Sequence, residues 1–145
     1  MREGKCELAG FNFPKSSTNN SKAFGTFGHL LTKNNGLIFF ATRLQGLAVA
    51  PGNPKKIYSI LDIASRKAKF INRREGTGTR ILFDQMLDVL AVKPEEIEGY
   101  NDISDTQFFT AVQIASGKVD VGLCTANVAK ENGLDFIPLA KEVYY

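Results

Sequence analysis

Apolar residues recur three or four positions apart between residues 80 and 90. This spacing predicts an amphipathic helix whose apolar side packs against a core. The positions that form this side are Leu82, Phe83, Met86, Leu87 and Leu90. A shorter stretch with the same spacing, residues 58–64, predicts a second helix.

Short apolar runs alternate with the helical segments in the second half of the chain. The strands predicted there are 68–72, 118–124 and 135–139, and the further helices are 105–115 and 126–131. Gly117 and the pair Asn132-Gly133 are typical of positions that follow a helix. Because strands alternate with helices, we predict an α/β fold with a mostly parallel sheet flanked by helices.

The first half of the chain has a less regular pattern. We predict a short strand at 7–11, a weak helix at 21–31 and a turn at Asn34-Asn35-Gly36. The apolar runs 37–42 and 46–50 predict two buried strands.

Length and charge restrict the class of protein. The chain has 145 residues and a net charge of +3, which predicts one domain at about 100–200 residues per domain. Its basic residues are scattered, whereas a nucleic-acid-binding surface gathers them on one face. No apolar run reaches the about 18 residues of a membrane-spanning helix, and no apolar leader is visible. We therefore expect a cytoplasmic protein with neither nucleic acid nor membrane as partner.

Residue types for catalysis are scarce. The one histidine, His29, lies in an apolar stretch, and Cys6 and Cys124 match no metal-ligand spacing. Sequence signatures of zinc hydrolases, thiol redox proteins, esterases and P-loop proteins are absent. We expect a protein that is not an enzyme, without catalytic residues, metal or cofactor, and with two reduced cysteines; a disulfide between Cys6 and Cys124 is the alternative.

One glycine-rich segment, residues 72–80, has the features of a binding site for a small anion. It lies between a predicted strand and a predicted helix, whose first backbone N–H groups have no partner within the helix. Glycines let the backbone approach a ligand, while threonine hydroxyls and arginines add donors and charge. The residues expected to face the anion are Arg73, Gly76, Thr77, Gly78, Thr79 and Arg80. The same pattern also fits a turn whose threonines only cap the helix.

Two further threonines are expected at the same edge of the sheet. Thr106 begins the helix at 105–115, and Thr125 follows the strand at 118–124. In open α/β sheets, ligands collect at the carboxyl ends of the strands, beside helix N-termini. Either threonine also fits a plain N-cap.

Several segments, in unbroken order over about residues 45–145, resemble the periplasmic-binding-protein-like domain. That domain occurs fused to molybdopterin-biosynthesis molybdotransferases and to helix-turn-helix regulators. The matching segments are residues 45–54, 70–73, 76–80, 99–100, 115–123 and 133–139.

The resemblance implies a type II periplasmic-binding fold, in which two α/β lobes joined by hinge strands hold a ligand between them. Relatives are described as sensing molybdate, tungstate or another small anion. Residues 73–79 are also similar to the Arg-x-x-Gly-Ser-Gly-Thr stretch of phosphate-binding proteins. The resemblance therefore implies a ligand-facing role for Thr77, Gly78 and Thr79, and also for Arg73 and Thr106.

The resemblance also predicts a domain organisation. We expect residues 1–50 to be a partial first lobe with hinge strands, 51–135 a second lobe and 136–145 a return strand, the N-terminal lobe being truncated. Gln107 stands where relatives often carry histidine. A homodimer or a partner domain would complete the cleft.

Two functions follow as expectations. The first is non-enzymatic binding or sensing of a small oxyanion such as molybdate, tungstate, sulfate or phosphate, linked to molybdenum-cofactor biosynthesis or its regulation. The alternative is a ligand-indifferent interaction module, a remnant that dimerises through unpaired strand edges such as 37–42.

Overall fold

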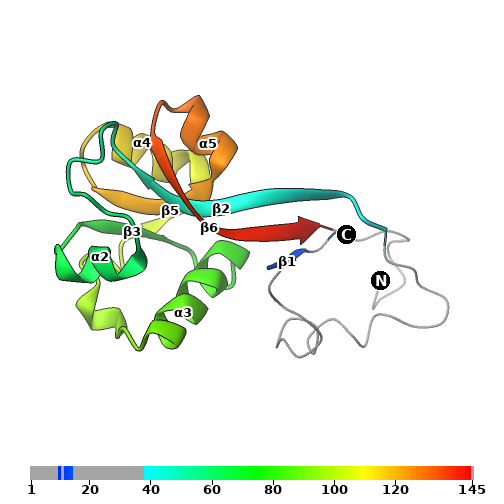
Figure 1. Ribbon diagram of the computed structural model, residues 1–145, viewed down its shortest axis with the longest axis horizontal. Coiled ribbons are helices and arrows are strands. Elements are labelled where there is room, and N and C mark those ends of the chain that lie inside the picture. Colours follow the sequence, from blue (N-terminus) through cyan, green and yellow to red (C-terminus); the bar gives the residue numbers. More distant parts are fainter. Residues whose placement is uncertain (1–9, 11, 15–37, 145) are drawn as a thin grey trace. The chain divides into compact units, whose positions relative to one another are not determined.

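The computed structural model describes residues 10, 12–14 and 38–144 of the chain (Figure 1). The chain divides into two compact units. Unit 1 contains the residues up to Arg43 and from Ala140 onward, and unit 2 contains residues 44–139. Two strands, β2 (Ala41–Val49) and β6 (Asp135–Tyr144), have residues in both units.

The sheet of unit 2 has the strand order β6-β2-β5-β3-β4. Its remaining strands are β3 (Phe70–Arg73), β4 (Ile103–Ser104) and β5 (Val121–Thr125). β3 runs parallel to both β5 and β4, whereas β2 runs antiparallel to β5 with Gln45 opposite Thr125. The carboxyl ends of the three parallel strands therefore lie at one edge of the sheet.

Helices cover both faces of this sheet (Figure 1). α2 (Ile60–Ser65) and α3 (Gly78–Leu90) lie on one face, and α4 (Gln107–Ala115) and α5 (Ala126–Glu131) lie on the other. A short 3₁₀ helix, η2 (Pro94–Glu96), follows α3. No helix in the described ranges is both long enough and apolar enough to cross a membrane.

Two layers of apolar side chains hold the helices on the sheet. Phe70 of β3 stacks on Phe83 of α3, with ring centroids 4.4 Å apart and both side chains fully buried. On the opposite face, Ile71 belongs to a second buried cluster with Ala111 and Ile114 of α4. Neighbouring residues of β3 thus face different layers, as the period of a strand requires. Burial of one such Phe or Ile side chain contributes about 1.5–3 kcal/mol.

In unit 1, β1 (Asn12–Pro14) pairs antiparallel with the end of β6, Asn12 lying opposite Tyr144. Glu142 is 1% exposed and accepts a hydrogen bond from Nε of Arg43 at 2.5 Å. The Arg43 guanidinium also lies 4.7 Å from the ring centre of Tyr144. The buried carboxylate is therefore neutralised by the neighbouring strand, which a charged group in a sheet interior needs.

The predicted α/β class, with a sheet flanked by helices, is confirmed, and so are the helices of the second half. The prediction of two strands at 37–42 and 46–50 was wrong, because a single strand, β2, runs through Arg43 and Gln45. The 37–42 segment is also not a fully unpaired edge, since Phe40 N–H donates to the carbonyl of Tyr144 at 2.9 Å. β4 was not predicted. β6 extends five residues beyond the strand predicted at 135–139, into the range predicted for the return strand, 136–145.

Several predictions fall outside the described residues. These are the helix at 21–31, the turn at 34–36, residues His29 and Cys6, and all but Gly10 of the strand at 7–11.

Candidate functional site

Four polar residues of unit 2 meet at the edge where the parallel strands end. The hydroxyl oxygen of Thr79 accepts hydrogen bonds from Nε2 of Gln45 and from Nε2 of Gln107, both at 3.0 Å. Oε1 of Gln107 in turn accepts the backbone N–H of Thr125 at 3.0 Å. We call Gln45, Thr79, Gln107 and Thr125 the edge cluster.

The topology of the sheet brings these residues together. Thr79 lies in the first turn of α3, which follows β3, and Gln107 is the first residue of α4, which follows β4. Thr125 ends β5, and Gln45 lies opposite it on β2. Gln45 is fully buried and Thr79 is 4% exposed, so the edge cluster links four elements through hydrogen bonds that are largely shielded from water.

The glycine-rich turn leads into the edge cluster. Gly76 has φ of +79°, a conformation that glycine adopts without steric cost. The Thr77 hydroxyl donates to the carbonyl of Arg74 at 2.8 Å and accepts the backbone N–H of Arg80 at 3.4 Å. The backbone N–H of Gly78 has no acceptor within residues 10, 12–14 and 38–144, and Gly78 is exposed.

Side chains of the protein already accept hydrogen bonds from several backbone N–H groups that the sequence predicted to be free for a ligand. The hydroxyl oxygen of Thr77 accepts the Arg80 N–H, and that of Thr106 accepts the Phe109 N–H at 3.0 Å. The side-chain oxygen of Gln107 accepts the Thr125 N–H. The expectation of a fully open donor cluster is therefore wrong at these three amides, because N-capping and the edge cluster satisfy them. Among the backbone N–H groups of this turn, that of Gly78 is exposed and has no acceptor within the described residues, as the sequence predicted.

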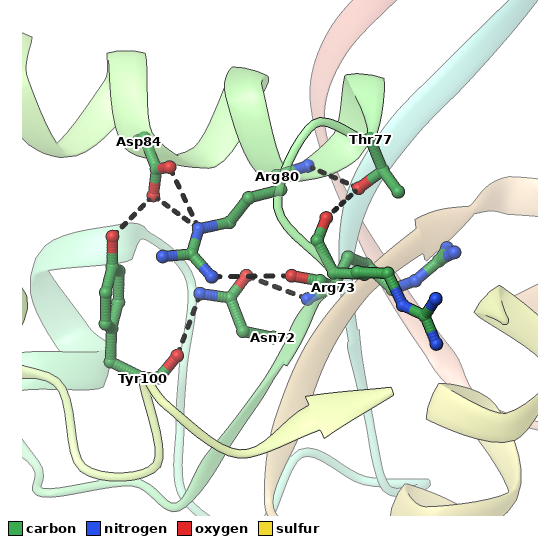
Figure 2. Close-up of polar contacts among 7 residues, drawn as sticks. Asn72, Arg73, Thr77, Arg80, Asp84 and Tyr100 are labelled. Atoms are coloured by element: carbon green, nitrogen blue, oxygen red, sulfur yellow. Dashed lines mark hydrogen bonds and ion pairs between the residues drawn. The ribbon is translucent and has the colours of Figure 1, made fainter. Parts of the chain in front are cut away.

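The Arg80 side chain extends between Asp84 of α3 and Tyr100 (Figure 2). Its side chain binds Asp84 through Nε at 2.9 Å and lies 4.3 Å from the ring centre of Tyr100. The Tyr100 hydroxyl donates to Asp84 at 2.9 Å, and burial, followed by this hydrogen bond, raises the pKa of Tyr100. We therefore correct the expected ligand-facing role of Arg80, because its side chain, 7% exposed, is engaged within the fold.

Arg73 holds the end of β3 against the loop before α4. Its Nε donates to the carbonyl of Ser104 at 3.0 Å, and its Nη2 donates to the carbonyl of Asp105 at 2.9 Å. Asn72 supports it by accepting the Arg73 N–H (Figure 2). Beside it, Arg74 pairs with the Asp105 carboxylate at 2.5 Å, and both side chains of this pair are exposed. Two cations therefore lie next to the turn, and the carboxylates of Asp105 and of Glu75, which lies in the turn itself, balance them in number.

The structure brings most of the predicted residues to one place. Thr79 and Thr125 belong to the edge cluster, Thr106 directly precedes Gln107, and Gly76, Thr77 and Gly78 form the turn into α3. Sequence reasoning missed Gln45 and Gln107 as members of the site. The one signal for Gln45 was a polar residue within an apolar run.

Two hollows of unit 2, of about 460 Å³ and about 140 Å³, contain no residue of the edge cluster in their walls. Within the described residues, no group of His, Cys, Asp and Glu side chains could hold a metal ion.

Comparison with known proteins identifies the family. The whole chain, residues 1–145, matches the family described as the PBP superfamily domain, the superfamily of periplasmic binding proteins. The chain is a member of this family. A curated relative, the "Uncharacterized protein YvgK" of Bacillus subtilis (strain 168), is 34% identical over 144 residues. The match covers 99% of this chain and 47% of YvgK, so the chain spans about half the length of that relative.

Solved structures show the same fold for this PBP superfamily domain. One, described as a two-component system protein that mediates signal transduction, has a TM-score of 0.57 at 11% identity, over 78% of this chain and 46% of that chain. Another, a periplasmic binding protein of an ABC transporter from Brucella ovis with glutathione bound, has a TM-score of 0.51 at 12% identity. It covers 72% of this chain and 34% of that chain. The resemblance to periplasmic binding proteins is thus confirmed, and the chain is a binding-protein-like domain.

Proposed function

We propose that this domain binds a small anion, without catalysis, at the edge cluster and the turn that leads into α3. The observation that carries the proposal is the convergence on Thr79, whose hydroxyl accepts hydrogen bonds from both Gln45 and Gln107. These bonds fix the first turn of α3 against β2 and α4. A rigid, hydrogen-bonded frame of this kind is what positions binding groups within a few tenths of an ångström.

The groups around this frame favour negative charge. The Gly78 N–H is exposed at the start of α3, a 13-residue helix whose dipole adds about half a positive charge there. Arg73 and Arg74 add two cations within the preceding six residues, and the carboxylates of Glu75 and Asp105 balance them in number. The exposed N–H and the helix dipole are therefore the contributions that attract the oxygen atoms of an anion.

Among anions, we propose a tetrahedral oxyanion first, with molybdate and tungstate ahead of sulfate and phosphate. The support for molybdate and tungstate is the resemblance of residues 45–145 to a domain whose relatives are described as sensing these anions. Phosphate is included because residues 73–79 are similar to the glycine-rich turn of phosphate-binding proteins. A role in molybdenum-cofactor biosynthesis or its regulation would follow from a preference for molybdate over sulfate.

Isothermal titration calorimetry tests this function. We expect heat of binding with at least one of molybdate, tungstate, sulfate and phosphate. We expect Thr79→Val, which removes the hydroxyl shared by the two glutamines, to abolish that heat. Thr79→Ser keeps the hydroxyl and is the matched control, so it should retain binding. Absence of heat with all four anions would contradict the proposal.

A second candidate is a ligand-indifferent interaction module. The observation that favours it lies in unit 1, where Ile38, Phe39 and Phe40 are 70%, 61% and 81% exposed. Three consecutive exposed apolar side chains are typical of a contact surface. Light scattering tests this candidate: a dimer that no anion alters, and that Phe40→Ser dissociates, would support it over anion binding.

A further inference from the structure

β4 is the last strand of the unit 2 sheet and pairs on one side with β3. Ile103 lies opposite Asn72, and the Asn72 N–H donates to the carbonyl of Asp102 at 2.8 Å. In a pair of parallel strands, a residue that forms hydrogen bonds to the partner strand lies opposite a residue that does not. The N–H and C=O of that opposite residue point away from the pair. The N–H and C=O of Ile103 therefore face away from β3. Neither has a hydrogen-bond partner in the part of the chain that the structure describes.

A groove of about 460 Å³ opens beside this strand, between β4 and α4. Its floor is apolar and consists of the buried side chains of Ile71 and Val119. Its walls are Ile103 and Phe109, each 45% exposed. The volume lies within the range of about 300–1,000 Å³ that ligand sites occupy. The groove thus offers an apolar surface next to unused backbone hydrogen-bonding groups.

Charges at the groove favour an acidic occupant. Lys69 and Lys118 both line it, and both are exposed. Asp102 is the one carboxylate in its wall, so the lysines leave an excess of positive charge. Neither lysine has an ion-pair partner in residues 38–144.

We propose that this groove binds an extended acidic segment of a partner protein, which adds to the free edge of β4. In such strand addition, backbone hydrogen bonds supply affinity and pockets for alternate side chains supply specificity. Ile103 provides the backbone donor and acceptor, the apolar floor receives an apolar side chain, and the two lysines pair with acidic side chains. The proposal concerns a surface apart from the edge cluster and does not depend on anion binding there.

The probe is a blocked pentapeptide of alternating glutamate and valine, titrated against the full chain by calorimetry. We expect binding that weakens as salt is raised, and no binding of the same peptide with lysine in place of glutamate. Two further peptides are methylated on alternate backbone nitrogens. One of these two should lose binding, because only one set of peptide N–H groups faces the strand edge in an extended segment.

Variants of the protein locate the site. Ile103→Pro removes the outward N–H, which β3 does not use, and we expect it to abolish peptide binding while Ile103→Val retains it. Lys69→Ala combined with Lys118→Ala should weaken binding about tenfold, equivalent to about 1.4 kcal/mol. Lys130→Ala, at an exposed lysine of α5, is the matched control and should have no effect.

Three results would overturn the proposal. The first is no binding of the acidic peptide at low salt. The second is equal binding of the acidic and the lysine peptides, or of both methylated peptides. The third is a dimer of this chain that Ile103→Pro dissociates, which would make a second copy the occupant of the edge.

Discussion

The side-chain carbonyl of Gln107 accepts the backbone N–H of Thr125 at 3.0 Å, and this bond joins the start of α4 to the end of β5. We predict that Gln107→Leu lowers the free energy of unfolding by about 1–3 kcal/mol, because a partly buried amide loses its acceptor. Urea denaturation measures this change. Gln113→Leu, six residues further along α4, is the matched control and should change stability by less. If both variants lowered the free energy of unfolding equally, the hydrogen bonds of the edge cluster would not stabilise the fold as predicted.

Arg80 is predicted to stabilise the fold through its contacts with Asp84 and Tyr100. Arg80→Ala should lower the free energy of unfolding by about 2 kcal/mol, since a desolvated cation–π contact and a hydrogen-bonded ion pair are both lost. The comparison is Arg66→Ala, which removes another i,i+4 pair, with Asp62, from a side chain that is 43% exposed. That variant should lose about 0.5 kcal/mol or less. If Arg66→Ala lowered the free energy of unfolding more than Arg80→Ala does, the contacts of Arg80 with Asp84 and Tyr100 (Figure 2) would not stabilise the fold as proposed.

Two glycines are required for different reasons, and alanine scanning separates them. Gly76 has positive φ and open space around it, so Gly76→Ala should cost about 1–2 kcal/mol from backbone conformation alone. At Gly46 a Cβ would lie 2.2 Å from the carbonyl oxygen of Ile137 and 2.7 Å from the Phe136 ring. We expect Gly46→Ala to cost about 3 kcal/mol or more, because β6 must move. Thermal denaturation of both variants tests this order, and the reverse order would contradict it.

Burial raises the pKa of the Cys124 thiol from 9.0 to about 12. Since the folded-state pKa is the higher one, the thiol contributes stability in full below about pH 9 and loses that contribution as the pH rises toward 12. We predict that wild type loses about 1 kcal/mol more than Cys124→Ala between pH 8 and pH 10. Urea denaturation at the two pH values measures the difference. Parallel losses in the two proteins would show that the thiol ionises normally in the folded state.

The reactivity of Cys124 follows from the same burial. In a Cys6→Ser background, a thiol-modifying reagent at pH 8 should label Cys124 only at the rate of unfolding, because the thiolate is the reactive form. Fast labelling of the native protein would contradict this.

Local patterns in the sequence predict much of this fold. The apolar spacing of residues 80–90 and the N-cap at Thr106 each correspond to an observed helix, because both signals act within a few residues. The continuity of β2 was not predictable in this way. Arg43 and Gln45 interrupt the apolar run, and their partners, Glu142 and Thr79, are 99 and 34 residues away.

The same limit applies to the candidate site. The sequence indicated Thr79 and Thr125 because they border a glycine-rich turn and a strand end, which are local features. Gln107 joined them only through contacts 28 and 18 residues apart along the chain. The role of Arg80 was mistaken for a related reason, since its partner Tyr100 lies beyond any local pattern.

The central claim is that a small anion binds where the turn at Gly76–Thr79 meets the edge cluster, and the Gly78 amide reports on it most directly. In a ¹⁵N-labelled sample titrated with molybdate, we predict that the Gly78 resonance shifts and saturates. The amide of Gly117, at the far end of α4, is the internal reference and should stay unchanged. A titration that leaves Gly78 unmoved, or that moves Gly117 equally, would contradict the account.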